Sequence, residues 1–110
     1  METDIFCKII AKEAEADFIM ESERWIAIKD IKPSAPIHII IIPKKHIAYL
    51  EDATENDKDL LGELLMAVST VAKKVGISDS GYKVAINQKE GGGQIVPHLH
   101  IHLLGGKRFN

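Results

Sequence analysis

The chain has 110 residues, 45% of them hydrophobic and 27% charged, and its formal net charge is −2. This length allows one domain, residues 1–110, with a single core. The sequence has no Lys/Arg-rich run, so a nucleic-acid partner is not expected. It also has no apolar run of roughly 18 residues and no signal-peptide pattern, so a membrane partner is not expected. The single cysteine, Cys7, fits a reducing compartment, so we predict a cytoplasmic protein.

The first elements predicted along the chain are a short helix and two strands. Residues 3–16 form the helix, with Thr3 or Asp4 as its N-cap and apolar residues at helical spacing. Residues 18–22 and 24–31 are short apolar stretches of the kind found in strands.

A turn and a third strand are predicted next. The two prolines within residues 32–36 indicate the turn. Residues 37–43, with the sequence IHIIIIP, alternate too little for a strand with one solvated face. We therefore expect both faces of this strand to be covered.

The clearest predicted element is a long helix over residues 54–75. Thr54 and Asp57 have the spacing of a capping box at its start, and Gly76 suits the position just after its end. One face carries apolar residues at the helical period, namely Leu61, Leu64, Leu65, Val68, Val71, Ala72 and Val75.

Two more strands, residues 81–88 and 95–104, are predicted on either side of the loop KEGGG. Together the elements predict an α+β fold with a mostly antiparallel five-stranded sheet, a short N-terminal helix and one long helix. We expect the helices on one side of the sheet.

Three of the five histidines, His98, His100 and His102, stand at every second position. In a strand they would share one face, while the aliphatic residues between them face the core. A purely structural role is disfavoured because each imidazole needs polar partners. A metal site is a second possibility, since His-x-His on a strand can present two ligands, but no carboxylate lies close by in the sequence.

The favoured interpretation is nucleophilic catalysis at phosphorus. An imidazole with its ordinary pKa near 6.5 is neutral and nucleophilic at working pH. One histidine would attack, with its second ring nitrogen held by a fixed acceptor, while its neighbours bind phosphate oxygens. The glycines at 91–93 would let backbone N–H groups approach those oxygens.

The segment GGGQIVPHLHIHLLGG, residues 91–106, resembles the signature of the histidine triad superfamily. IFCKII near the start, residues 29–47 and residues 81–87 resemble its Hint branch, the purine nucleoside phosphoramidate hydrolases. The resemblance implies a nucleotide hydrolase or transferase without a cofactor. Its substrates would be purine nucleoside 5′-phosphoramidates or related mixed anhydrides such as acyl-adenylates. A nucleotidyl-histidine intermediate would release a nucleoside monophosphate of the AMP or GMP type.

The resemblance also implies roles for individual residues. His100 would be the nucleophile, with its other ring nitrogen held by a backbone carbonyl, and His102 would bind the phosphate oxygens. His38 would complete a hydrogen-bonded relay with His98. Asp30 would accept hydrogen bonds from the 2′- and 3′-hydroxyls of the ribose.

The implied nucleotide site has two further parts. The apolar slot for the base would consist of Ile5, Phe6, Ile9, Ile28 and Ile31. The phosphate and its leaving group would contact Asn87, Gly93, Gln94, Ile95 and Val96. At Ile95 many Hint-type proteins have a serine or threonine, so a hydroxyl near the leaving group is missing. Lys89 likewise stands where a glycine is usual.

Two alternatives remain at this level. One is a hydrolase of dinucleoside polyphosphates, and the other is a nucleotide-binding or scaffold protein with incidental hydrolysis, which Ile95 motivates. The resemblance further implies a C2 homodimer. Gly62 and Met66, beside the apolar stripe of the 54–75 helix, support close approach of a partner.

Many bacterial relatives hold a structural zinc with Cys-x-x-Cys and two histidines. The corresponding positions in this chain are Asp4, Cys7, His46 and His98. Because a carboxylate replaces one thiolate, and Asp4 has a competing use as a helix N-cap, we expect no bound metal. His98 would then be free for the relay, and Cys7 would be a small buried core residue.

Overall fold

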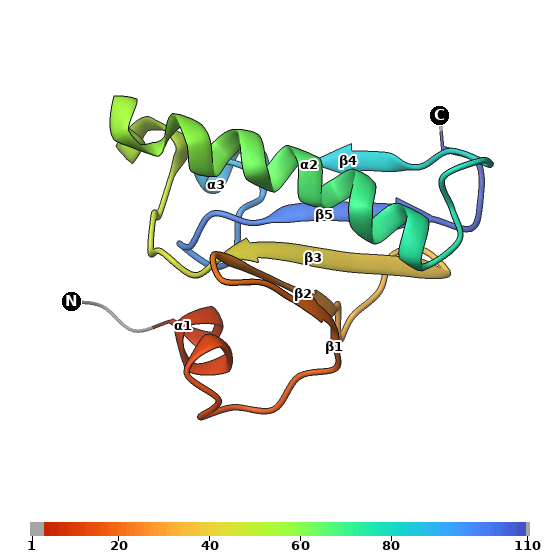
Figure 1. The fold of residues 1–110 in the computed structure, drawn as a ribbon, viewed down its shortest axis with the longest axis horizontal. Helices are drawn as coiled ribbons and strands as arrows, with labels where there is room; N and C mark the ends of the chain where they lie inside the picture. The colour runs from red at the N-terminus through yellow and green to blue at the C-terminus, as the bar shows by residue number, and fades with distance from the viewer. Residues whose placement is uncertain (1–3, 110) are drawn as a thin grey trace.

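The computed structural model describes residues 4–109 (Figure 1). A five-stranded antiparallel sheet has the strand order β1-β2-β3-β5-β4. Its strands are β1 (Phe18–Glu21), β2 (Trp25–Lys29), β3 (Ile37–Pro43), β4 (Lys83–Ala85) and β5 (Ile101–Gly105). The helices are α1 (Ile5–Ile10), α2 (Lys58–Lys74) and α3 (Lys89–Gly92), with 3-10 turns at Leu50–Asp52 and Glu55–Asp57. No helix in this described part is long and apolar enough to cross a membrane.

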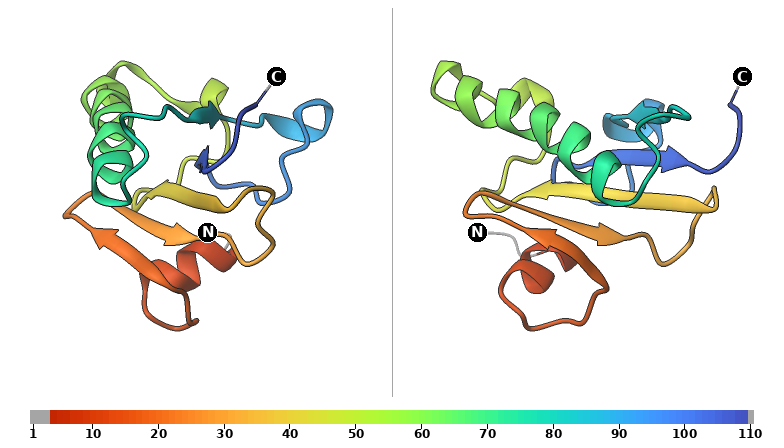
Figure 2. Two further views of the ribbon diagram at one scale, coloured as in Figure 1. Left: turned by 90° about the vertical axis from the view of Figure 1, so that its right-hand side faces the viewer. Right: turned by 45° about the vertical axis from the view of Figure 1, so that its right-hand side comes forward.

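Strand β3 is the centre of the core, and its two faces belong to different layers. Ile39 and Ile41 pack in the cluster that includes α2, whereas Ile40 and Ile42 pack in the cluster that includes α1. The prediction that both faces of this strand are covered is therefore confirmed. The prediction that the helices share one side is wrong, because α1 and α2 lie on opposite faces of the sheet (Figures 1 and 2).

Helix α2 has the predicted signals at both ends. The capping box is present, with Thr54 N donating to Asp57 Oδ2 at 2.9 Å. Gly76 follows the helix with a φ of 80°, a left-handed conformation that glycine adopts without strain. Leu64 is buried against the sheet, but Leu65 points outward, because consecutive helical residues differ by about 100° around the axis.

Helix α1 is shorter than predicted. Asp4 is its N-cap, with Oδ1 accepting from Cys7 N at 2.8 Å, while Thr3, the alternative cap, lies outside the described residues. The helix ends at Ile10, and Lys12 follows with a φ of 64°, so the chain turns away toward β1. Phe6 and Ile9 are buried on the sheet.

The last strand differs most from its prediction, because β5 begins at Ile101 and not at residue 95. Pro97 has no N–H for a strand ladder, and Leu99 N donates to Ile47 O at 2.6 Å instead of to a neighbouring strand. Of the three alternating histidines, only His102 is therefore in a strand. Strand β4 is also shorter than predicted, and the loop KEGGG contains the one-turn helix α3.

Candidate active site

Four histidines gather where β3, β5 and the segment before β5 meet the side of α1. His38 is on β3, and His102 on β5 is paired with Ile40, which packs in the α1 layer. The Phe6 ring of α1 lies edge-on to His100, with ring centroids 5.0 Å apart. Leu99, Ile101 and Leu103 pack in the opposite layer with α2, so the predicted separation into a histidine side and a core side is confirmed.

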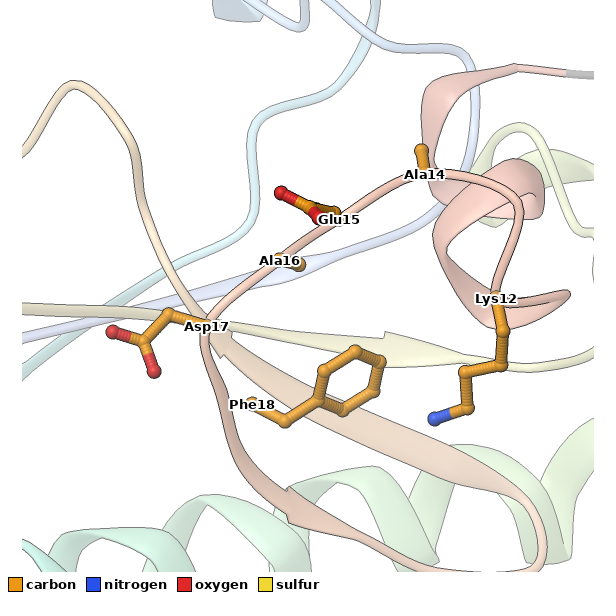
Figure 3. A pocket seen from close by; sticks show the side chains of 6 residues that line it. All are labelled: Lys12, Ala14, Glu15, Ala16, Asp17 and Phe18. Atoms are coloured by element: carbon orange, nitrogen blue, oxygen red, sulfur yellow. The ribbon is translucent and has the colours of Figure 1, made fainter.

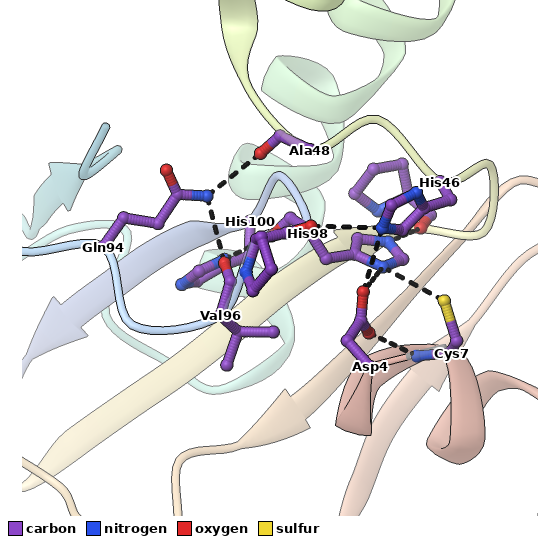
Figure 4. Close-up of polar contacts among 10 residues, drawn as sticks. Asp4, Cys7, His46, Ala48, Gln94, Val96, His98 and His100 are labelled. Carbon is purple, nitrogen blue, oxygen red and sulfur yellow. Dashed lines mark hydrogen bonds and ion pairs between the residues drawn. The ribbon is translucent and has the colours of Figure 1, made fainter. Parts of the chain in front are cut away.

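The orientation of His100 is fixed by the backbone. Its Nδ1 lies 2.6 Å from His98 O, and because a carbonyl only accepts, Nδ1 must carry the proton (Figure 4). Nε2 is then left with its lone pair. Burial lowers the pKa of His100, so its imidazole stays neutral below the ordinary histidine value.

The ring of His98 is fully buried, and both of its nitrogens have partners. Nε2 donates to Pro43 O at 2.9 Å, while Nδ1 lies 3.1 Å from Asp4 Oδ2 and 3.6 Å from Cys7 Sγ. The predicted relay between His38 and His98 is therefore wrong. His98 acts through its backbone carbonyl on His100, while its side chain is bound to α1 and to the end of β3.

His38 instead pairs with His102. The distance from His38 Nε2 to His102 Nδ1 is 2.9 Å, and Asp30 Oδ2 lies 3.3 Å from the same His38 nitrogen. Burial, with smaller contributions from His100 and His38, lowers the pKa of His102 to about 4. Asp30, His38 and His102 thus form a connected group.

A second group surrounds Asp4. Its Oδ2 contacts His46 Nε2 at 3.0 Å as well as His98, and Asp4, Cys7, His46 and His98 can each bring a donor atom within 4.8 Å of the others (Figure 4). Burial by itself raises the pKa of the Asp4 carboxyl, but the hydrogen bond from Cys7 N and the nearby His98 together lower it more. Cys7 is only half-buried, so its prediction as a core residue is wrong, and burial raises the pKa of its thiol.

The residues predicted to hold the base fall into two sets. Phe6, Ile9 and Ile28 are buried and pack together in the α1 layer. Ile5 is 48% exposed and Ile31 is 91% exposed. The first set can form the floor of an apolar slot, and the second offers uncovered apolar surface.

The segment before the histidines is closed by its own side chains. Gln94 Nε2 donates to Ala48 O and Val96 O, both at 3.0 Å, and its Oε1 accepts from Lys89 N at 2.7 Å. Asn87 Nδ2 donates to Gly92 O at 2.7 Å. Gln94 and Asn87 therefore shape the loop with these atoms, while Ile95 is 92% exposed and Val96 packs on the α1 layer.

Two hollows have different positions relative to this site. One of about 590 Å³ is lined by Tyr49, Lys89, Glu90, Gly93, Gln94, Ile95 and Pro97. It borders the predicted leaving-group segment. The other, of about 660 Å³, is lined by residues between α1 and β1 and includes Phe18 and Lys12 but no histidine (Figure 3). The first is the one relevant to the candidate site.

Known proteins share both the sequence and the fold. The HIT domain model matches residues 11–109. The chain belongs to the HIT family. It is 45% identical to Protein HitA of Neisseria gonorrhoeae over 105 residues, which is 96% of this chain and 97% of that protein.

Two solved HIT structures illustrate the likeness. A HIT family hydrolase from Legionella pneumophila has 42% identity and a TM-score of 0.95, covering 98% of this chain and 96% of that one. A histidine triad nucleotide-binding protein from Candida albicans has 33% identity and a TM-score of 0.84, covering 92% and 73%. These relatives agree with the predicted membership of the histidine triad family and the predicted fold.

Several contacts of this HIT domain have no signal in its sequence. Ser34 N donates to His38 Nδ1 at 3.0 Å, and Pro43 O accepts from His98. Both are backbone groups, so residue type says nothing about them. The contact of Asp4 with His98 spans 94 positions, and only the shared zinc-site pattern of relatives links the two residues in sequence.

The Asp4 group is one of two clusters of described residues whose ligand atoms lie close enough to hold a metal ion; the other consists of Asp30, His38 and His102. The Asp4 group has only one thiol, and Asp4 Oδ1 is already used to cap α1. His98 Nε2 is also occupied, because it donates to Pro43 O. One carboxylate in place of a thiolate makes a poorer zinc site.

We therefore expect metal analysis of protein purified without chelator or histidine tag to find far less than one zinc per chain. Cys7→Ser should then unfold thermally much like the wild type, with Lys8→Ala as the control on the exposed side of the same helix. About one zinc per chain, lost together with thermal stability in Cys7→Ser alone, would show that this expectation is wrong.

Proposed function

We propose that this HIT protein hydrolyses purine nucleoside 5′-phosphoramidates or related mixed anhydrides through a nucleotidyl-His100 intermediate. The observation that carries the proposal is the hydrogen bond of 2.6 Å from His100 Nδ1 to His98 O. It leaves Nε2 unprotonated, as a nucleophile requires. The hydrolase and nucleotide-binding names of the two solved relatives give further support.

In the first step, His100 Nε2 attacks phosphorus. A P–N bond forms to His100 as the bond to the leaving group breaks; a leaving amine takes a proton from water, whereas a carboxylate leaves without one. In the second step, water attacks phosphorus and gives up a proton to solvent as the bond to His100 breaks, which releases the nucleoside monophosphate and restores the neutral imidazole. The carbonyl of His98 stabilises the Nδ1–H throughout, because positive charge develops on the ring during attack.

His102 is proposed to bind the phosphate oxygens. Its Nδ1 accepts from His38, so its Nε2 carries the proton and can donate to an anionic oxygen. Asp30 is proposed to accept from the ribose hydroxyls through Oδ2, since Oδ1 already accepts from Lys32 N at 2.8 Å.

The base and the leaving group of the substrate are assigned to different sides of the histidines. The base is proposed to lie on the apolar slot, with Ile5 and Ile31 covering it. The leaving group is proposed to lie toward the hollow beside Gln94 and Ile95. Because Ile95 is almost fully exposed and has no hydroxyl, an apolar leaving group suits this side better than a polar one.

Replacing His100 by Ala should abolish turnover of adenosine 5′-phosphoramidate and the nucleotidyl-protein seen by mass spectrometry, because no other group supplies the nucleophile. His102→Asn should retain the intermediate but lower kcat by roughly 10²–10³-fold, the range for losing one hydrogen-bond donor to an oxygen that gains charge in the transition state.

His46→Gln is the matched control, since this histidine lies outside the His38–His102 pair. Near-normal turnover by His100→Ala would refute the covalent mechanism. Micromolar binding of AMP or GMP without turnover of phosphoramidates, acyl-adenylates or dinucleoside polyphosphates would identify a nucleotide-binding protein instead. A preference for substrates with two nucleotides would identify the dinucleoside polyphosphate hydrolase.

The pH dependence of kcat/KM should reflect the buried imidazoles. The pKa of His100 is lowered and that of His102 is about 4, so both rings remain neutral as the pH falls through 6.5. The rate should therefore hold as the pH falls through 6.5 and decline only at a lower pH, where the neutral imidazoles take up protons. A pH–rate profile with a substrate that is stable in acid measures this. An acid limb with its midpoint at 6.5 or above would contradict it.

We propose further that the protein is a homodimer. Met66 is 70% exposed on α2, Leu65 beside it is also exposed, and Tyr82, Val84 and Ile86 are exposed around the edge strand β4. Large apolar side chains next to an unpaired strand edge are typical of a surface that a second chain covers.

Light scattering at micromolar concentration should give the mass of two chains. Met66→Glu should shift the mass toward one chain, because it would place a charge in the covered surface. Lys73→Glu, also exposed on α2, serves as the control and should keep the wild-type mass. A wild-type mass of a single chain would exclude the dimer.

A further inference from the structure

One N–H of His38 has two possible acceptors. Ser34 N donates to His38 Nδ1 at 3.0 Å, and because a backbone N–H cannot accept, this nitrogen must be unprotonated. The proton of the neutral ring is therefore on Nε2. His102 Nδ1 lies 2.9 Å from this Nε2, and Asp30 Oδ2 lies 3.3 Å from it.

The His102 nitrogen and the Asp30 oxygen compete for the Nε2–H of His38, and burial strengthens both contacts. The side chain of His38 is 6% exposed and that of Asp30 is 17% exposed, so water has little access to replace either contact. Asp30 is held in place by Lys32 N, which donates to Oδ1 in the turn that follows β2. Oδ2 is the oxygen that faces His38, and it is also the oxygen left to bind another donor.

A donor that binds to Asp30 Oδ2 changes what His38 does. Hydroxyl groups on the carboxylate satisfy part of its charge and weaken its attraction for the His38 proton. The Nε2–H of His38 then makes a stronger hydrogen bond to His102 Nδ1. Hydrogen bonds in a chain polarise one another, so the Nε2–H of His102 becomes a stronger donor on its other side.

We propose that Asp30 and His38 couple recognition of a vicinal diol to the strength with which His102 donates to phosphate. His38 is a positioning residue in this scheme, and the ligand class is a nucleotide with free 2′- and 3′-hydroxyls. The inference rests on the proposed function for the placement of the diol at Asp30 and the phosphate at His102. Its consequence is that the diol increases kcat, because negative charge on phosphate grows in the transition state.

The test compares adenosine 5′-phosphoramidate with its 2′,3′-dideoxy analogue, which has the same leaving group. In the wild type, loss of the diol should lower kcat by roughly 5-fold or more, in the range usual for coupled sites, and should also raise KM. In His38→Gln both substrates should react slowly with nearly the same kcat, while the difference in KM remains. Asp30→Asn should likewise reduce the kcat ratio.

A matched pair of variants tests the role of the Ser34 amide. Ser34→Ala keeps the backbone N–H and should keep the wild-type kcat ratio. Ser34→Pro removes the N–H, so His38 is no longer restricted to one tautomer and the ratio should fall. The same loss in Ser34→Ala would point to the side chain and would contradict the proposal.

A second measurement does not depend on turnover or on a variant. The ¹⁵N NMR shifts of the ring nitrogens identify the tautomers of His38 and His102 in the full-length wild type. AMP should strengthen the His38–His102 hydrogen bond, while 2′,3′-dideoxy-AMP should bind without this change.

The outcomes separate the two proposals. Equal kcat for both substrates in the wild type would overturn the coupling while leaving the hydrolase intact. Absence of turnover with every nucleotide would contradict the hydrolase, and the NMR comparison would then decide the coupling. Identical shifts with both nucleotides, or binding of neither, would overturn the coupling.

Discussion

The whole site depends on the hydrogen bond from His100 Nδ1–H to the carbonyl of His98. An imidazole can attack only through an unprotonated nitrogen, and a carbonyl acceptor on the other nitrogen fixes which one that is. The carbonyl must itself be held still. The buried ring of His98 does this, because it is tied to Pro43 O at the end of β3 and to Asp4 at the start of α1. The central strand and the terminal helix thus meet in one residue beside the candidate nucleophile.

Two identical side chains, two positions apart, are given opposite properties by the backbone. A carbonyl acts on His100, so its outer nitrogen has a lone pair. A backbone amide determines the tautomer of His102 indirectly. Ser34 N–H donates to His38 Nδ1, so His38 donates from Nε2 to His102 Nδ1, and the proton of His102 is on its outer nitrogen, Nε2. Neither result needs a charged group or a shift of pKa across neutrality. The pairing of a nucleophile with a donor follows from where one C=O and one N–H lie.

The sequence predicted best what depends on local patterns. The bounds of β3, the capping box of α2 and Gly76 after it are all confirmed, since each follows from periodicity or from contacts within a few residues. The start of β5 and the partner of His38 were predicted wrongly, because both depend on distant backbone groups. Leu99 N donates to Ile47 O and not to a neighbouring strand, so β5 starts later than predicted. Residue types give no sign of such a contact. The side of the sheet that α1 covers is equally a matter of tertiary packing, since an apolar helix face can pack on either layer.

Helix α1 has only six residues, far fewer than the roughly 12–15 that an isolated helix needs to be even marginally stable in water. It holds its shape because Phe6 and Ile9 are packed on the sheet and Asp4 is bound to His98. Segments near a chain terminus generally open locally at a lower free-energy cost than the strands of a core. If α1 opened, Phe6 would lose its contact with the His100 ring, and water could reach this buried imidazole. The exclusion of water from the candidate nucleophile therefore depends on a helix that only its tertiary contacts hold in place.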